Sequence, residues 1–253
     1  METQVISPLL AHDEMAAPSM GWVLDKLESL PDYVGLFEAA FGGGPSVASL
    51  GSAIALWERS LLSANSPFDR WFFGGESQAL NAEEQSGFAL FRGKAGCSGC
   101  HLIKEKYALF TDNGYHDTGI SHADGHKHLT IPIQIEPGRV VLVARDLVES
   151  VSEGEPSDLG RFEITLRQQD MWHFKTPGLR NIALTAPYMH DGSLKDLNQV
   201  VHFYNQGGKP HEGQDPKIRP LNLDENEQAS LVRFLKTLTG DNRGALIRDA
   251  RHR

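Results

Sequence analysis

Apolar residues recur at helical spacing in several stretches of the chain, and this pattern predicts a mainly α-helical protein with long loops. The stretch 46–62 is strongly amphipathic. The stretch 20–40 has the same spacing but is interrupted at Pro31, and the stretch 224–239 ends before Gly240. We therefore expect helices in these three stretches, with a break at the proline and a stop at the glycine.

A polar signal marks the start of another helix. Asn81 is followed three residues later by Glu84, which is the residue pair of a capping box. The helix that it predicts runs through Phe91 and ends shortly before two closely spaced cysteines.

Residues 121–160 follow neither pattern. They contain a β-branched run from Val140 to Val143 and an acidic stretch rich in Ser, Gly and Pro. We interpret the region, about 121–170, as a long loop insertion at the surface, in which a hairpin can form. Three histidines (His122, His126 and His128) could bind a metal there, but no Cys or carboxylate spacing accompanies them, and a solvated loop is favoured.

The pentapeptide Cys97-Ser98-Gly99-Cys100-His101 carries the clearest chemistry. Thiols at i and i+3 can form thioethers to the two vinyl groups of one porphyrin, and the adjacent His then lies beneath the iron. A zinc site would need a second Cys or His pair, and a thioredoxin-like pair would follow a strand. The motif predicts one covalent haem c, with Cys97 and Cys100 as tethers and His101 as proximal ligand. It uses both cysteines of the chain, which leaves none for a disulfide.

The ligand on the opposite face of the iron decides the chemistry of such a haem. The candidates in the second half of the chain are Met189, Tyr204, His190 and His202, or the position stays open. A thioether favours electron transfer, a phenolate stabilises oxidised iron, and an open position permits reaction with peroxide. Spacing alone leaves these alternatives open.

The net charge, the lengths of the apolar runs and the residues after Met1 indicate which partners and which cellular location to expect. The 253 residues carry a formal net charge of -9, which argues against nucleic acid and suits docking to a basic electron carrier. No apolar run approaches the roughly 18 residues of a membrane-spanning helix. The residues after Met1 lack a basic and then apolar leader, although haem c is normally attached outside the cytoplasm. We expect a periplasmic protein whose chain is a processed form, a fragment or the product of a misplaced start.

Long motifs resemble the bacterial di-haem cytochrome c peroxidase and MauG family. They are Phe174–Gly192 (FKTPGLRNIALTAPYMHDG), Val200–Gly208 (VVHFYNQGG), Leu61–Arg70 (LLSANSPFDR) and Tyr115–Ile120 (YHDTGI). The resemblance covers roughly residues 5–240 and matches the later part of that family. It implies a helical remnant or bridging segment of the N-terminal, peroxidatic haem domain over 1–80. It also implies a C-terminal cytochrome c-like haem domain over 81–253.

The resemblance also implies roles for single residues. The distal ligand in this family lies nineteen residues after a Thr that matches Thr185 here, and it is Met in the peroxidases but Tyr in MauG. Position 204 is Tyr, so Tyr204 is the implied distal ligand and Met189 a packing residue. Backbone carbonyls of Thr185 and Pro187 match ligands of the family's calcium ion, which takes oxygen ligands. Glu14, near Pro8, resembles the acid/base residue of the first haem.

The chain departs from the family in two places. The family has two Cys-x-x-Cys-His motifs, whereas this chain has one. In addition, Ala95 stands where MauG has a Trp, which argues against the tryptophan-derived substrate of MauG as the substrate here. The resemblance therefore implies the electron-transferring half of a peroxidase that reduces hydrogen peroxide to water. A cytochrome c or a cupredoxin would supply the electrons, and a second haem domain or chain would supply the peroxide-reducing haem. The alternatives are a stand-alone mono-haem electron carrier and a MauG-like oxidase with a His/Tyr-ligated haem.

Overall fold

The computed structural model describes residues 2–11, 14–121, 130–136, 139–144, 159–242, 244–245 and 247–248. The chain divides into two compact units, Met1–Leu62 and Ser63–Arg253. The segment 63–80 therefore belongs to the same unit as the cysteine motif. The assignment of residues 1–80 to a remnant of another haem domain stays a prediction.

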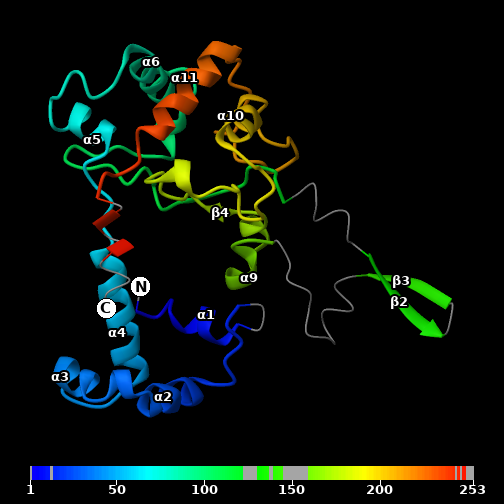
Figure 1. Cartoon of the computed structure of the whole chain (residues 1–253). Helices are drawn as coiled ribbons and strands as arrows, with labels where there is room; N and C mark the ends of the chain where they lie inside the picture. The colour runs from blue at the N-terminus through cyan, green and yellow to red at the C-terminus, as the bar shows by residue number, and fades with distance from the viewer. Residues whose placement is uncertain are drawn as a thin grey trace. The chain divides into compact units, whose positions relative to one another are not determined.

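The first unit is helical (Figure 1). Its elements are α1 (Ile6–Leu10), α2 (Met20–Ser29), the 3-10 turn η1 (Pro31–Tyr33), α3 (Leu36–Phe41) and α4 (Val47–Ser60). The predicted break is confirmed, because α2 ends at Ser29 and Pro31 opens the turn. The strong amphipathic stretch forms α4, which begins at a reciprocal Ser46 and Ser49 capping box.

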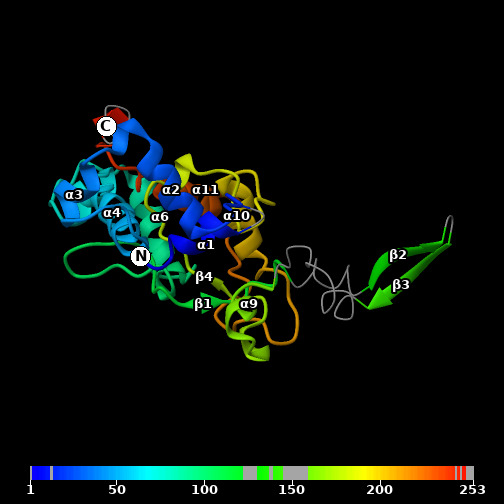
Figure 2. The same cartoon turned by 90° about the horizontal axis from the view of Figure 1, so that it is seen from below.

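Three helices and an aromatic cluster build the core of the second unit. The helices are α5 (Pro67–Phe72), α6 (Ala82–Arg92) and α11 (Glu225–Lys236), and α6 and α11 lie side by side in Figure 1 and Figure 2. Phe68, Phe88, Phe91 and Phe234 are buried where they meet. The Phe68 ring centroid lies 5.7 Å from that of Phe88 and 5.9 Å from that of Phe234. The helix α10 (Leu197–Asn205) packs on α11.

The crossing of α6 and α11 requires a glycine. A Cβ added at Gly87 would lie 2.0 Å from the carbonyl oxygen of Ser230 and 2.8 Å from Cβ of Phe234. Both helices begin at reciprocal capping boxes, Asn81 with Glu84 and Asp224 with Glu227, so the capping box predicted at Asn81 is confirmed. These caps fix where each helix starts and hence which residues face each other at the crossing.

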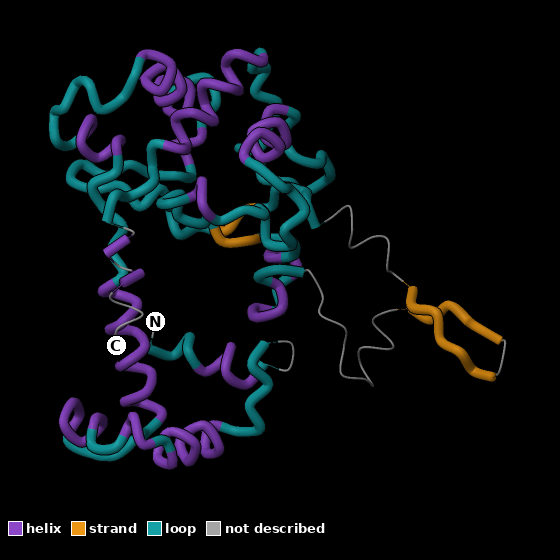
Figure 3. Tube along the Cα trace, in the orientation of Figure 1, coloured by secondary structure: helices purple, strands orange, loops and turns teal. Residues whose placement is uncertain are grey.

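Strands form two short antiparallel pairs among the described residues (Figure 3). β1 (Tyr115–His116) pairs with β4 (Phe174–Lys175), and β2 (Thr130–Glu136) pairs with β3 (Arg139–Ala144). The remaining elements are α9 (Phe162–Thr165) and the 3-10 turns η2 (Cys97–Gly99), η4 (Gln168–Asp170) and η5 (Ile182–Leu184).

The mainly α-helical fold class and the hairpin within 121–160 are thus confirmed. His122, His126 and His128 lie outside the described residues. No helix in the described ranges combines the length and the apolar composition needed to cross a membrane.

We predict that Gly87→Ala destabilises the second unit by about 1–3 kcal/mol, because the new methyl group overlaps backbone atoms that cannot move aside cheaply. Thermal unfolding followed by circular dichroism measures the effect as a lowered midpoint. Gly99→Ala is the control, since a Cβ there meets nothing within 4 Å. Equal midpoints for the two variants would contradict this account of the crossing.

Candidate functional site

The two cysteines lie in the turn η2, directly after the helix α6. His101 N–H donates to the Cys97 carbonyl at 2.9 Å, which closes the turn, and Cys97 packs against the aromatic core. Burial raises the pKa of Cys97 to about 12, and burial also raises the pKa of Cys100. Both thiols are therefore protonated near neutral pH, and no negative charge is buried against the aromatic rings.

His101 is held in one orientation by a backbone carbonyl. Its Nδ1 lies 2.8 Å from the carbonyl oxygen of Phe110. Because a carbonyl only accepts, the proton sits on Nδ1, and the lone pair of Nε2 is left to bind a metal. Burial lowers the pKa of His101, so the imidazole is neutral at neutral pH, which is the form that ligates iron.

Tyr204 is brought close to the same two cysteines from the opposite end of the sequence. It stands near the end of α10, whose N-cap Asp196 accepts a hydrogen bond from Gln199 N–H at 3.0 Å. Burial is the largest cause that raises the pKa of Tyr204 to about 12, and the ionisable thiols of Cys97 and Cys100 add to it. The phenol thus interacts electrostatically with both cysteines. Two thiols, an imidazole and a phenol are residue types that fit a covalently tethered haem.

The other candidates for the distal position have different surroundings. His190 Nε2 lies 2.9 Å from Ser121 Oγ, and its ring stacks on Phe174 with centroids 3.8 Å apart. His202 is exposed, and its Nε2 lies 2.9 Å from Nε2 of Gln206. Met189 is partly buried and has a φ of 71°. These contacts tie both imidazoles to partners other than the cysteine motif.

The remaining predicted residues lie at the surface of their units. Thr185 and Pro187 are exposed beside the turn η5, where Tyr188 Oη donates to the Ile182 carbonyl at 2.7 Å. Glu14 is exposed in the first unit, whereas the cysteine motif and Tyr204 belong to the second. The structure thus brings together Cys97, Cys100 and Tyr204, with His101 next to them in the chain.

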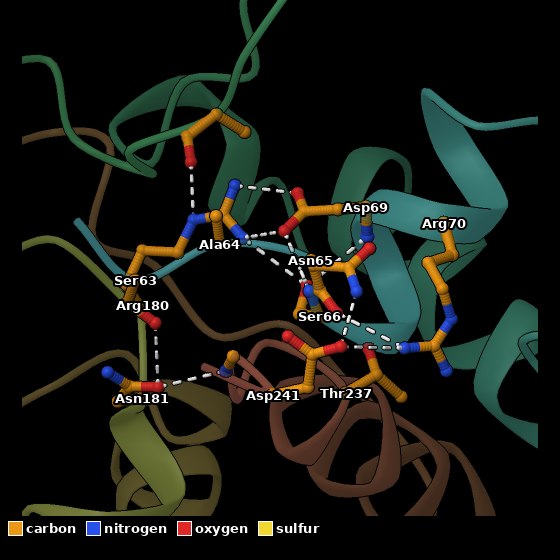
Figure 4. A network of polar contacts seen from close by, with 12 residues as sticks. Ser63, Ala64, Asn65, Ser66, Asp69, Arg70, Arg180, Asn181, Thr237 and Asp241 are labelled. Atoms are coloured by element: carbon orange, nitrogen blue, oxygen red, sulfur yellow. Dashed lines mark hydrogen bonds and ion pairs between the residues drawn. The ribbon is translucent and has the colours of Figure 1, made fainter. Parts of the chain in front are cut away.

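An arginine not singled out from the sequence supports the segment that orients His101. Arg180 donates to both carboxylate oxygens of Asp69, at 2.6 Å and 2.8 Å, and its Nε donates to the Ala108 carbonyl at 2.7 Å (Figure 4). Its guanidinium also lies over the Phe110 ring, 5.3 Å from the centroid. Because Phe110 accepts the hydrogen bond of His101, this arginine fixes the segment that orients the His101 imidazole.

The ion pair with Arg180 changes the pKa of Asp69. Burial by itself raises the pKa of Asp69, but the hydrogen bonds from Arg180 and Ser66 and the charge of Arg180 outweigh it, and the pKa is lowered. Around this pair, the Asn65 side chain donates a hydrogen bond to Asp241, and Asn181 Oδ1 accepts a hydrogen bond from Ser63 Oγ at 3.0 Å (Figure 4). The sequence signal was present, since Arg180 lies inside the long motif Phe174–Gly192.

A histidine between two carboxylates lies next to Cys100. His116 Nε2 is 2.9 Å from Asp112 Oδ2, and His116 Nδ1 is 2.5 Å from Asp215 Oδ2. Side-chain atoms of Cys100, Asp112 and His116 all lie within 4.8 Å of one another. Burial by itself lowers the pKa of His116, but the two aspartates outweigh it and the pKa is raised. The imidazole is thus stabilised as a cation between its partners.

Comparisons with known proteins identify relatives of this chain. A family model described as di-haem cytochrome c peroxidase matches residues 1–78. The methylamine utilization protein MauG of Methylorubrum extorquens is 33% identical over 95% of this chain and 58% of its own length. The cytochrome-c peroxidase IdrP1 of Denitromonas iodatirespirans is 35% identical over 85% of this chain and 56% of its own length. The chain therefore spans somewhat more than half of these relatives.

A solved structure shares the fold. It is a MauG-like protein associated with microbial copper homeostasis, with 30% identity and a TM-score of 0.70 over 95% of this chain and 69% of its own. The di-haem peroxidase BthA of Burkholderia thailandensis, at 22% identity and a TM-score of 0.64, supports the fold alone.

We predict that Arg180→Lys lowers the free energy of unfolding by about 1–3 kcal/mol, because lysine keeps the charge but cannot reproduce the bidentate contact and the bond to Ala108. Arg70→Lys is the matched control, since Arg70 makes more exposed ion pairs with Glu76 and Asp241, and we expect a change within about 0.5 kcal/mol. Denaturant unfolding of both variants gives the comparison. A decrease in the free energy of unfolding as large for Arg70→Lys as for Arg180→Lys would argue against a larger contribution from the buried pair.

Proposed function

The chain belongs to the di-haem cytochrome c peroxidase and MauG family, and we propose that it is the electron-transferring, haem c-bearing half of such an oxidoreductase. The proposal is supported by the Cys97-Ser98-Gly99-Cys100-His101 motif, by a His101 whose Nδ1 is held by the Phe110 carbonyl, and by the electrostatic interaction of Tyr204 on α10 with both thiols. A tethered haem with two axial residues suits electron transfer, because no open position is left for peroxide.

The side chains have separate tasks in this proposal. Cys97 and Cys100 would hold the haem covalently, and His101 and Tyr204 would be the ligands of its iron. When bound, the haem supplies a centre that gains and loses one electron at a time. The hydrogen bond from His101 Nδ1–H to Phe110 makes Nε2 a stronger donor. Tyr204, whose pKa is about 12 without a metal, gives up its proton only to a strongly attracting cation.

Peroxide reduction to water needs two electrons and two protons, and we assign this chemistry to a second haem. That haem would come from a domain outside these 253 residues or from a partner chain. Glu14, exposed in the first unit, would serve it as acid/base. A small cytochrome c or cupredoxin would supply the electrons. Haem c attachment implies the periplasm as the location.

We also propose a calcium ion at Thr185 and Pro187. Both residues are exposed, so that their backbone carbonyls can contribute to a shell of oxygen ligands. Two carbonyls are too few for calcium, and the remaining ligands would come from water or from the domain that carries the second haem.

One observation favours a MauG-like oxidase as the second candidate function. A tyrosine, rather than a methionine, interacts electrostatically with the cysteine motif, and phenolate ligation stabilises oxidised iron. A stand-alone mono-haem carrier is the third candidate, and it differs from the others in needing no second haem.

The assignment of the distal ligand predicts different outcomes for two substitutions. Tyr204→Phe removes the hydroxyl, so we expect the ferric absorption spectrum to change toward that of a haem with an open position. Met189→Leu, the control, should leave the spectrum unchanged. A near-infrared sulfur-to-iron band in the unaltered protein, together with no change in Tyr204→Phe, would assign Met189 instead.

The proposed role predicts which reactions the haem-loaded chain performs. It should accept electrons rapidly from reduced cytochrome c but turn over hydrogen peroxide only after the N-terminal haem half of the Methylorubrum extorquens relative is added. Stopped-flow absorbance measures the first reaction and peroxide consumption the second. Fast peroxide turnover by the chain alone would rule out the role of an electron-transferring half. Electron acceptance without any turnover after addition of the other half would favour the stand-alone carrier.

A further inference from the structure

Two histidine–aspartate pairs join neighbouring residues of one segment to the loop that follows α10. His116 Nδ1 lies 2.5 Å from Asp215 Oδ2, and His211 Nε2 lies 3.0 Å from Asp117 Oδ2. The pairs are reciprocal, because the histidine comes from the 116–117 segment in one and from the loop in the other. The second pair is almost completely buried, with side-chain exposures of 4% for His211 and 2% for Asp117.

We propose that these two pairs position Tyr204 for the haem iron. The inference rests on the proposed function, in which Tyr204 is the distal ligand. His116, Asp117, His211 and Asp215 are positioning residues in this proposal, since they act on the iron through the tyrosine rather than by touching it.

Backbone hydrogen bonds connect the two histidine–aspartate pairs to the end of α10. Asp215 N–H donates to the Asp117 carbonyl at 3.1 Å, and Lys209 N–H donates to the Thr118 carbonyl at 3.2 Å. The loop is in turn closed on the helix, because Gly207 N–H donates to the carbonyl of Tyr204 itself at 3.0 Å. A shift of the 116–118 segment therefore reaches the tyrosine through the loop that follows it.

The two segments approach too closely to slide past each other. Gly119 has a φ of 77°, and a Cβ there would lie 1.9 Å from the carbonyl oxygen of Lys209. The Trp172 ring stands edge-on to the His211 ring, with centroids 5.7 Å apart. The loop is thus confined by backbone contact, by an aromatic ring and by two histidine–aspartate contacts.

The same pairs reach the tether of the haem. His116 contacts Asp112 at 2.9 Å with its other nitrogen, and Asp112 lies beside Cys100. A continuous set of contacts therefore runs from Cys100 through Asp112, His116 and Asp215 to the loop behind Tyr204. This set fixes the distal residue relative to the cysteine that anchors the porphyrin.

The test uses the haem-loaded chain and imidazole as a small probe of the distal position. Asp215→Asn and Asp117→Asn remove the charge of each pair but keep an oxygen for the backbone N–H groups of Lys217 and Gly119. We expect covalent haem to be retained, the ferric spectrum to shift toward that of Tyr204→Phe, and imidazole to bind at least roughly tenfold more tightly, because the fraction of chains with an open position rises.

Asp170→Asn is the matched control. Asp170 forms an ion pair with Arg161 at 3.5 Å and is 14% exposed, close to the 15% of Asp215, but among the described residues it forms no ion pair with the loop. We expect this variant to keep the spectrum and the imidazole affinity of the unaltered protein. If Asp117→Asn yields no folded holoprotein, the test rests on Asp215→Asn alone, because Asp215 is less buried than Asp117.

The outcomes separate the inference from the proposed function. If Tyr204→Phe changes the spectrum while Asp215→Asn only lowers the unfolding midpoint, the positioning role is overturned and the ligand assignment stands. If Tyr204→Phe itself changes nothing, the ligand assignment fails and the inference fails with it.

Discussion

The bidentate contact between Arg180 and Asp69 is the interaction on which the candidate site depends most. It joins α5, the segment that ends at Phe110 and the long motif that contains the arginine. Both side chains are only 17% exposed, and a buried ion pair stabilises a fold only when its hydrogen bonds are satisfied. That condition is met here, because Ser66 adds donors to Asp69 and Ala108 receives the remaining Nε–H of Arg180.

The aromatic core adds apolar packing to the polar contacts of the ion pair. The crossing of α6 and α11 at Gly87 sets the distance between two helices, and the rings of Phe88, Phe91 and Phe234 fill the space beside it. The Phe110 ring also packs on this cluster, 5.2 Å from that of Phe68. The residue that accepts the hydrogen bond of His101 is therefore held by apolar packing on one face and by the guanidinium of Arg180 on another.

Local signals in the sequence were enough for α2, α4, α6 and α11, but not for α10 or for the supports of the site. Pro31 and the Asn81 capping box act within a few residues, so a sequence alone reveals them. Arg180 and Asp69 are 111 positions apart, and His116 and Asp215 are 99 apart, so only the folded chain pairs them. The strand β1 has two residues, too few for any alternation of apolar and polar positions. Tyr204 was assigned from a family resemblance, not from periodicity.

The two faces of the proposed haem site depend on different supports. Arg180 acts on the proximal side through Phe110, whereas the reciprocal histidine–aspartate pairs act on the loop behind Tyr204. The two networks meet at residues 110–112, because Phe110 accepts the hydrogen bond of His101 and Asp112 contacts His116. Contacts that share a short segment generally do not contribute additively to stability. A substitution on one side of the proposed haem site is therefore expected to affect the other side through residues 110–112.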